Sequence, residues 1–398
     1  MNDFPIAYLN SNDGTSILAF GNGPNLRIEN EGLSEMQSFI DAHQGEYILL
    51  TLAYDLKNDI EKLSSENFDG VEFPKSILWV PENIVRIDNN QWEYLAGKQS
   101  ADNTIFISEF INRQKNTSSS LNFKFNPRTQ VEDYLKNVNQ LKEEIQQGNI
   151  YEVNYCQEYY AENVVLEKPI DVYWKLNEIT KAPYSTFFSF DEFSIFSGSP
   201  ESYINKKGSK VISSPIKGTR KRGSSQEKDE HLKKELFTDE KERSENVMIV
   251  DLVRNDLSKI ATKGSVQVEE LMQIYTFETV HQMISKISCQ VKNNLSFTDI
   301  LRATFPMGSM TGAPKISAMK LIEKHEEFKR GIYSGSIGYI SPNGDFDLNV
   351  IIRTLVYNRT KRYLSCAVGG AITIQSTAES EYEECQVKVK GILDKLNA

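Results

Sequence analysis

Strand-like and helix-like patterns follow one another along this chain without a regular strand–helix–strand rhythm. Three long stretches of strand-like residues, 150–160, 185–204 and 210–219, come in succession, and the segments with helical spacing, 129–149 and 244–261, lie outside that series. A doubly wound parallel sheet needs a helix between successive strands, whereas antiparallel strands can be joined by turns. The pattern therefore predicts an α+β fold.

We expect two regions that form one intertwined structural unit. The length of 398 residues allows one large domain or two. Residues 1–125 mix short apolar runs with turn signals, which predicts mostly strands. The polar stretch 112–127, NRQKNTSSSLNFKFNP, has the composition of an exposed connection. Residues 126–398 contain all the segments that indicate chemistry.

The charge balance excludes a strongly basic surface. The chain has 45 Lys and Arg against 55 Asp and Glu, a net charge of −10, so an anionic ligand must meet cations that are arranged locally. The most apolar run, 47–54, is too short to cross a bilayer, and residues 1–14 have neither a basic nor an apolar leader region. We therefore expect a soluble cytoplasmic protein that binds neither nucleic acid nor membrane.

The four cysteines, Cys156, Cys289, Cys366 and Cys385, are far apart and have no spacing typical of a metal site. We expect them to be reduced residues of the core. None lies in a Gly-x-Cys-x-Gly turn of the kind that glutamine-hydrolysing amidotransferases use.

Two pairs of glutamates share one spacing, Glu242 with Glu245 and Glu381 with Glu384. Each pair lies where a helix is expected to begin, and residues three apart project from one helix face. Two such helices could together offer oxygen ligands to Mg²⁺. The alternative is that both pairs are acidic first turns that complement helix dipoles. Lys388, four residues after Glu384, is either a salt-bridge partner or a cation for a substrate carboxylate.

The loop 308–317, GSMTGAPKIS, is a candidate anion site. Thr311 and Gly312 precede Pro314, which is typical of a helix start with free backbone N–H groups, although plain capping explains the same pattern. The loop does not have the Walker pattern, because Lys315 does not follow Gly312 directly.

Four further residues allow more than one interpretation. His281 by itself is more typical of a packed histidine than of a catalyst. Arg353 lies in the strand-like run NVIIRTLVY, and a buried arginine usually has an anionic partner. Gly369 and Gly370 permit a close backbone approach, which a β-bulge would explain equally well.

One family accounts for these features as an ordered series. The chain closely resembles the chorismate-utilising enzymes in the segments SPESY, SPIKGTR, EKERSENVMIVDLVRND, FETVHQMIS, FPMGSMTGAPK, YSGSIGYI, VIIRT, VGGA and ESEYEE. The matches cover about residues 130–398, and TLAYDLKN fits the family's less distinctive N-terminal region. The resemblance implies an anthranilate synthase component I-like fold, in which two subdomains pack β-sheets in a sandwich with helices outside.

The same resemblance implies a site in a cleft. Its Mg²⁺ ligands match Glu242, Glu245, Glu381 and Glu384. Its binding groups for the substrate match Thr311, Tyr333, Arg353, Lys388 and the backbone at Gly369 and Gly370. One departure is Ala371, where related synthases often have a third glycine.

Lys217 distinguishes between branches of the family. Members that make anthranilate usually read PIAGT, whereas aminodeoxychorismate synthases commonly read PIKGT, as this chain does. In the implied reaction the lysine amine attacks chorismate C2 while the C4 hydroxyl leaves, and ammonia then attacks C4 and expels the lysine. Glu201 matches a glutamate that assists proton transfer at the leaving hydroxyl, and His281 matches a histidine near the reacting ring.

A reactive amine at Lys217 requires a depressed pKa, because a free lysine is protonated at neutral pH. Burial or cationic neighbours would depress it, and Arg220, Lys221 and Arg222 are candidates, whereas a nearby carboxylate would oppose them. The sequence leaves that balance open.

The nucleophile and its source follow from two further features. Isochorismate and salicylate synthases of the family use a lysine base where this chain has Glu152, which favours ammonia over water. Because the chain has no amidotransferase cysteine motif, we expect a separate glutamine amidotransferase subunit to supply the ammonia. The product would be 4-amino-4-deoxychorismate, a precursor of para-aminobenzoate and folate. Two alternatives stay open: anthranilate synthase component I, and a non-catalytic regulatory subunit that binds chorismate.

Overall fold

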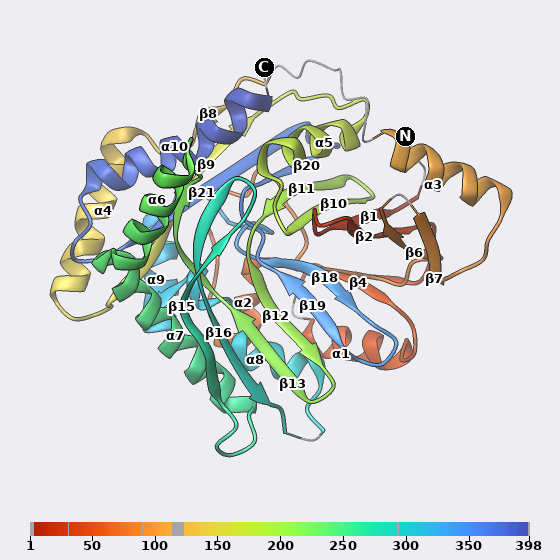
Figure 1. Cartoon of the computed structure of the whole chain (residues 1–398), viewed down its shortest axis with the longest axis horizontal. Coiled ribbons are helices and arrows are strands. Elements are labelled where there is room, and N and C mark those ends of the chain that lie inside the picture. The colour runs from red at the N-terminus through yellow and green to blue at the C-terminus, as the bar shows by residue number, and fades with distance from the viewer. Residues whose placement is uncertain (1–3, 31, 90, 114–122, 293, 397–398) are drawn as a thin grey trace.

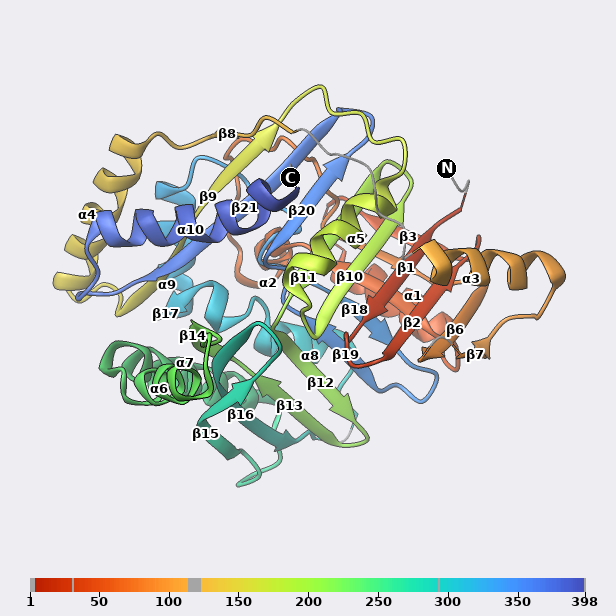
Figure 2. The same ribbon diagram turned by 45° about the horizontal axis from the view of Figure 1, so that its top comes forward.

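Two large antiparallel sheets dominate the computed structural model, which describes residues 4–396 apart from residues 31, 90, 114–122 and 293 (Figure 1). One sheet has eleven strands and the other has ten. Helices cover the outer faces of the sheets (Figures 1 and 2). This arrangement confirms the predicted α+β fold.

The first sheet runs across the upper part of Figure 2. Its strands lie in the order β17 (Gly312–Ala313), β9 (Glu152–Ala161), β21 (Tyr363–Ile372), β20 (Thr354–Asn358), β11 (Phe193–Ser199), β10 (Tyr184–Phe190), β1 (Ile6–Asn10), β2 (Thr15–Phe20), β6 (Asn83–Asp88) and β7 (Gln91–Ala96), with β8 (Asn126–Pro127) beside β9.

The second sheet contains the strand that carries Lys217. Its strands lie in the order β14 (Ile216–Lys221), β16 (Val280–Gln290), β13 (Lys210–Ser214), β12 (Ser202–Lys207), β19 (Phe346–Asn349), β18 (Ser336–Ile340), β4 (Ile48–Leu52), β5 (Ser76–Trp79) and β3 (Asn25–Ile28), with β15 (Gln267–Thr276) beside β16.

The helices connect and cover these strands. In chain order they are α1 (Leu33–Ala42), α2 (Lys57–Glu61), α3 (Ala101–Arg113), α4 (Val131–Gln146), α5 (Pro169–Thr180), α6 (Gln226–Thr238), α7 (Glu240–Ile260), α8 (Phe297–Thr304), α9 (Lys315–His325) and α10 (Ala378–Leu396), with short 3₁₀ turns at Tyr54–Leu56 and Gly308–Met310.

Strands from the first hundred residues enter both sheets. β1 pairs with β10 in the first sheet, and β4 pairs with β18 in the second. The N-terminal region therefore adds strands to sheets that the rest of the chain also builds. Of the expected connection at 112–127, residues 114–122 lie outside the described part of the chain.

Three large apolar clusters hold the layers together, beside a small one of Leu236, Met272 and Met283. One lies between the sheets near the N-terminal strands and includes Ala7 and Phe188 of the first sheet with Leu49 and Ile77 of the second. Another joins the first sheet to α4, α5 and α10, and the third joins the second sheet to α1, α7 and α8. Burial of these side chains is the main driving force for this packing.

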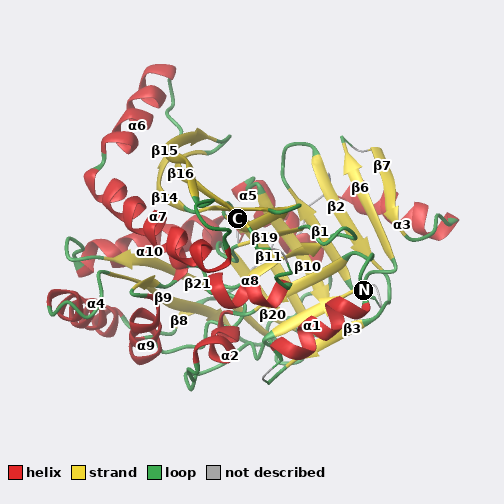
Figure 3. Cartoon of the chain, turned by 90° about the horizontal axis from the view of Figure 1, so that it is seen from below, coloured by secondary structure: helices red, strands yellow, loops and turns green. Residues whose placement is uncertain are grey.

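The helix expected at 244–261 begins at Glu240, because the side chain of Asp239 caps it by accepting a hydrogen bond from the backbone N–H of Glu242 at 3.1 Å. α6 and α7 lie along the side of the molecule that carries β14, β15 and β16 (Figure 3). Because α7 begins there, Glu242 and Glu245 lie in its first two turns. Glu381 and Glu384 likewise lie in the first two turns of α10.

All four cysteines are free and buried, as the sequence predicts. In the described part of the chain, no helix combines the length and the apolarity that crossing a membrane would require.

Candidate active site

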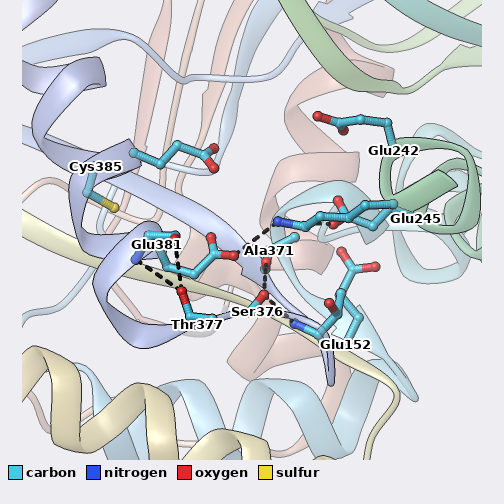
Figure 4. A network of polar contacts seen from close by, with 12 residues as sticks. Glu152, Glu242, Glu245, Ala371, Ser376, Thr377, Glu381 and Cys385 are labelled. Carbon is cyan, nitrogen blue, oxygen red and sulfur yellow. Dashed lines mark hydrogen bonds and ion pairs between the residues drawn. The ribbon is translucent and has the colours of Figure 1, made fainter. Parts of the chain in front are cut away.

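Four elements bring charged side chains to one place. β9 carries Glu152 and β14 carries Lys217, while Glu245 and Glu381 lie in the first two turns of α7 and α10. α10 packs on β21, the neighbour of β9, and α7 packs on β14 and β16. Figure 4 shows Glu245 and Glu381 facing each other across a narrow space, toward which Glu152 extends from its strand.

Lys217 is buried among carboxylates. Its Nζ donates a hydrogen bond to Glu152 Oε1 at 2.7 Å and lies 3.6 Å from Glu245 Oε2. Burial lowers the pKa of this amine, but the charges of Glu152 and Glu245 outweigh that effect and hold the pKa above its usual value. Lys217 is therefore an ammonium in the ligand-free protein.

The two arginines that follow this lysine in the sequence contact other carboxylates. Arg220 Nη2 lies 2.7 Å from Asp239 Oδ2, and Arg222 Nη2 lies 2.7 Å from Asp229 Oδ2. Lys221 is exposed. The balance that the sequence leaves open therefore falls to the carboxylates, because those of α6 and of the α7 cap neutralise the two arginines and others surround the amine.

Within this group of side chains, three buried carboxylate oxygens have no hydrogen-bond partner among the described residues: Glu152 Oε2, Glu245 Oε1 and Glu381 Oε2. Burial, countered in part by Lys217, raises the pKa of Glu245 to about 7. Lys241 Nζ lies 3.0 Å from Glu381 Oε1 and 3.9 Å from Glu245 Oε1, between the two helices. A single ammonium thus bridges carboxylates that come from α7 and α10.

The other two predicted metal ligands lie nearer the surface. Glu242 is partly buried, and burial followed by the charge of Asp239 raises its pKa. Glu384 is about half exposed and lies 2.7 Å from Lys388 Nζ, which holds its pKa below the usual value although burial opposes this. Among the described residues, no three His, Cys, Asp or Glu side chains are arranged so that they could hold a metal ion as they stand.

The two glycines of β21 leave space beside these carboxylates. A Cβ at Gly370 would lie 3.3 Å from Glu381 Oε2, and one at Gly369 would lie 2.4 Å from Cys156 Sγ. The carbonyl of Gly369 accepts a hydrogen bond from Lys388 Nζ at 2.7 Å. A side chain at either position would intrude on the site or on the neighbouring strand.

Glu201 lies just before β12 and is buried. Its Oε1 accepts a hydrogen bond from the hydroxyl of Ser309 at 2.8 Å. Burial raises the pKa of this carboxyl to about 7, although Ser309 and then Lys217 oppose the shift. A carboxyl with a pKa in this range can both donate and accept a proton near neutral pH.

Arg353 precedes β20 instead of pointing from within a strand, and its φ of 51° is in the left-handed region. No ion pair of Arg353 occurs among the residues that the structure describes, and burial lowers the pKa of its guanidinium. A partly buried cation without an anion is suited to an anionic ligand.

Thr311 and Tyr333 are both buried near these elements. The Thr311 hydroxyl donates to the carbonyl of Met307 at 3.1 Å, so it stabilises its own loop. Tyr333 lies in the apolar cluster of the second sheet, together with Cys156 from the first. Burial raises the pKa of Tyr333 well above the ordinary value.

His281 has partners outside the carboxylate group. Its Nε2 lies 2.9 Å from Asp229 Oδ1 and its Nδ1 lies 2.9 Å from the hydroxyl of Thr276. Because a carboxylate only accepts, Nε2 donates to Asp229, and Nδ1 shares a hydrogen bond with the threonine hydroxyl. Both ring nitrogens are thus used in linking β16 to α6 and β15, and the role of His281 near a reacting ring stays a prediction.

The sequence reasoning missed Lys241, Ser309 and the ion pair between Lys217 and Glu152. The spacing of Lys241 and Glu245, four residues apart on a helix, is a signal that could have indicated the first. The other two contacts join residues that are 108 and 65 positions apart, and no local pattern predicts them.

A model of the chorismate binding enzyme family matches residues 6–394, and the chain belongs to that family. Chloroplastic aminodeoxychorismate synthase of Arabidopsis thaliana is 40% identical over 277 residues, which are 69% of this chain and 30% of that protein. Anthranilate synthase component 1 of Aquifex aeolicus is 37% identical over 262 residues, 66% of this chain and 52% of that protein. The chain thus spans at most about half of the length of these relatives.

The fold is that of anthranilate synthase component I. The crystal structure of this protein from Streptococcus pneumoniae has a TM-score of 0.81 and 27% sequence identity, and the match covers 95% of this chain and 92% of that one. The aminodeoxychorismate synthase and the anthranilate synthase are about equally similar to the chain. Overall similarity therefore does not distinguish the two activities, and the argument for one of them depends on the residues of the site.

Proposed function

We propose that this protein aminates chorismate at C4, using Mg²⁺ and ammonia from a separate glutamine amidotransferase subunit, and yields 4-amino-4-deoxychorismate. The observation that carries the proposal is a buried lysine amine, Lys217, surrounded by carboxylates where the reacting ring would lie. The similarity to aminodeoxychorismate synthases supports it. The words "component 1" in the names of other relatives fit a separate partner subunit.

The lysine must lose its proton before it can attack, and Glu152 is the carboxylate in contact with it. In the proposed first step the proton of Lys217 passes to Glu152, Nζ bonds to chorismate C2, and the C4 hydroxyl leaves as water with a proton from Glu201. In the second step ammonia bonds to C4, its surplus proton goes to Glu201, and the bond from C2 to Lys217 breaks as the lysine regains its proton. Chorismate and ammonia thus give the aminated product and water.

The chemistry of the carboxylates supports a divalent cation. Glu245 and Glu381 each have one buried oxygen without a hydrogen-bond partner among the described residues, and carboxylate oxygens are the ligands that Mg²⁺ prefers. We propose that the ion is held by Glu242, Glu245, Glu381 and Glu384. When bound, Mg²⁺ would neutralise the ring carboxylate of chorismate and hold the ring against Lys217.

The second carboxylate of chorismate needs another cation. We propose that Arg353 binds it, because its partly buried guanidinium has no ion-pair partner among the described residues. Tyr333, Thr311, Lys388 and the backbone at Gly369 and Gly370 would complete the substrate pocket. Two carboxylates at fixed points would orient C2 and C4 toward the reacting groups.

The second candidate is anthranilate formation, in which nitrogen is added at C2 and pyruvate is eliminated. The similarity to anthranilate synthase component I in sequence and in fold favours it. Lys217 opposes it, because a lysine that occupies C2 directs ammonia to C4. A non-catalytic regulatory subunit is disfavoured by the four glutamates and the buried lysine.

The test is the identity of the product. Purified protein is incubated with chorismate, Mg²⁺ and an ammonium salt at alkaline pH. The products are separated by chromatography and identified by mass spectrometry. Metal-dependent 4-amino-4-deoxychorismate without pyruvate supports the proposal, and anthranilate with pyruvate supports the second candidate. Chorismate binding without turnover, also after addition of glutaminase subunits, would favour the regulatory subunit.

A further inference from the structure

The backbone around Glu201 is fixed on both sides. Its N–H donates to the hydroxyl of Ser199 at 3.2 Å, and its carbonyl accepts from the N–H of Val350 at 3.0 Å. These bonds leave the orientation of the side chain to its own contacts. Two hydrogen bonds orient it: the Ser309 hydroxyl donates to Oε1, and the backbone N–H of Ile216 also donates to the carboxyl.

Ser309 is itself held by buried residues. Its carbonyl accepts from Asn154 Nδ2 at 3.2 Å, and the carbonyl of Met310 accepts from Arg330 Nη1 at 2.7 Å. Arg330 is buried in a two-point ion pair with Glu326, with N–O distances of 2.9 and 2.6 Å. The loop therefore presents the Ser309 hydroxyl in one position.

A small cavity of about 20 Å³ adjoins Glu201 and Ser309. A volume of about this size holds roughly one water molecule. Asp256 of α7 lines the same cavity and is neutralised by Lys259 at 3.0 Å and by Lys315 of α9. The Asp256 carboxylate thus has two cationic partners of its own.

We propose that Ser309 is a positioning residue for the reaction, whose hydroxyl fixes Oε1 of Glu201 so that the other carboxyl oxygen carries the proton that is transferred at the leaving hydroxyl. The inference rests on the proposed function of Glu201 and extends it to a residue that does not touch the reacting atoms. No other side chain among the described residues is seen to donate to this carboxyl.

The direction of the effect distinguishes this role from a structural one. A hydroxyl that donates to a carboxylate favours its ionised form, so removal of the hydroxyl raises the pKa of Glu201 further. As a proton donor, Glu201 would then stay protonated to higher pH. Ser309→Ala should lower kcat by roughly 10- to 100-fold, because the reaction rate falls steeply when a reacting group is misplaced. It should also shift the alkaline limb of the pH profile to higher pH.

The experiment compares pH profiles of kcat for the wild type, Ser309→Ala and Ser309→Thr, which keeps the hydroxyl and can place its methyl group in the adjoining cavity. Ser285→Ala is the matched control, since Ser285 is a buried serine whose hydroxyl donates to Asn246 at 2.6 Å. We expect restoration by threonine and an unchanged alkaline limb in the control. A fall in kcat with no movement of the limb, or an equal fall in both Ser309 variants, would overturn the proposal.

A second readout needs no turnover. The protonation of Glu201 is followed by infrared spectroscopy of the ligand-free protein, with Glu201→Gln to assign the carboxyl band. The band should persist to higher pH in Ser309→Ala than in the wild type, and an identical titration would overturn the proposal. Because this measurement uses no substrate, it can succeed or fail independently of the proposed function, which the product analysis of the wild type tests.

Discussion

The ammonium of Lys217 donates a hydrogen bond to Glu152 at 2.7 Å, and both side chains are buried. The pair joins β14 of the second sheet to β9 of the first. It keeps the lysine charged in the ligand-free protein, and it also provides a carboxylate that can take the proton when the amine is needed. Glu152 Oε2 has no hydrogen-bond partner among the described residues, which leaves it free to hold that proton.

Lys217→Ala should lower the ammonia-dependent kcat by about 10³-fold or more, because the variant has no amine to form the intermediate. Chorismate binding should be largely retained, since other groups would hold the two carboxylates. Turnover is measured by product analysis and binding by calorimetry. Lys221→Ala, an exposed lysine on the same strand, is the control and should behave like the wild type. Normal turnover in Lys217→Ala would mean that the lysine is not the nucleophile.

Glu152→Gln should make the reaction depend on solvent to deprotonate the lysine. Glutamine can accept the hydrogen bond of the ammonium but cannot take its proton. Loss of the negative charge also lowers the pKa of Lys217, because Glu152 is the carboxylate that raises it most. We therefore expect kcat to fall at neutral pH and to rise with pH more steeply than in the wild type. Parallel pH profiles for the two proteins would exclude Glu152 as the proton acceptor.

The sequence predicts those parts of the molecule that depend on local pattern. The helical spacing and turn signals place α4, α7 and α10 within a few residues, and the spacing of Glu242 with Glu245 puts both on one helix face. The α+β class follows from the succession of strands without intervening helices. Such features depend on residues close to one another in the chain.

The electrostatic state of the site was not predictable, because it depends on contacts between distant segments. Arg220 follows Lys217 by three residues, yet its guanidinium faces Asp239, and the lysine meets Glu152 on another sheet. Which carboxylate approaches a lysine is decided by the packing of the two sheets and α7. The approach of Ser309 to Glu201 has the same origin.

Lys241→Met should strengthen Mg²⁺ binding to the substrate-free protein. The Lys241 ammonium lies 3.0 Å from Glu381 and 3.9 Å from Glu245, so it occupies the space between two proposed ligands of the ion. A divalent cation entering that space must displace it and overcome its repulsion. Removal of the charge should therefore lower the Kd for Mg²⁺ by about 10-fold, measured by calorimetry without chorismate.

Thermal unfolding gives an independent measure of the same competition. Without Mg²⁺ the carboxylates of Lys241→Met lack their bridging cation, so its Tm should fall, and Mg²⁺ should raise the Tm more in the variant than in the wild type. Lys259→Met is the control, because Lys259 lies on the same helix and pairs with Asp256 instead. An equal Mg²⁺ response in the two variants would show that Lys241 does not compete with the ion.

Glu201 should make the stability of the ligand-free protein depend on pH. Burial raises the pKa of its carboxyl to about 7 from an ordinary 4.5. Between these values the folded protein binds a proton that the unfolded chain releases, so the contribution of Glu201 to the free energy of unfolding is lost as the pH rises through that window. Glu201→Gln removes this dependence. Its free energy of unfolding relative to the wild type should increase by about 2 kcal/mol between about pH 5.5 and about pH 8.

The measurement is denaturant unfolding of both proteins at the two pH values, without Mg²⁺ or chorismate. Glu240→Gln is the control, because Glu240 is exposed at the start of α7 and should show the same pH dependence as the wild type. A constant difference between Glu201→Gln and the wild type would mean that Glu201 ionises at the same pH in the folded and unfolded chains. Such a carboxyl would be ionised at neutral pH, and it could not serve there as the proton donor at the leaving hydroxyl.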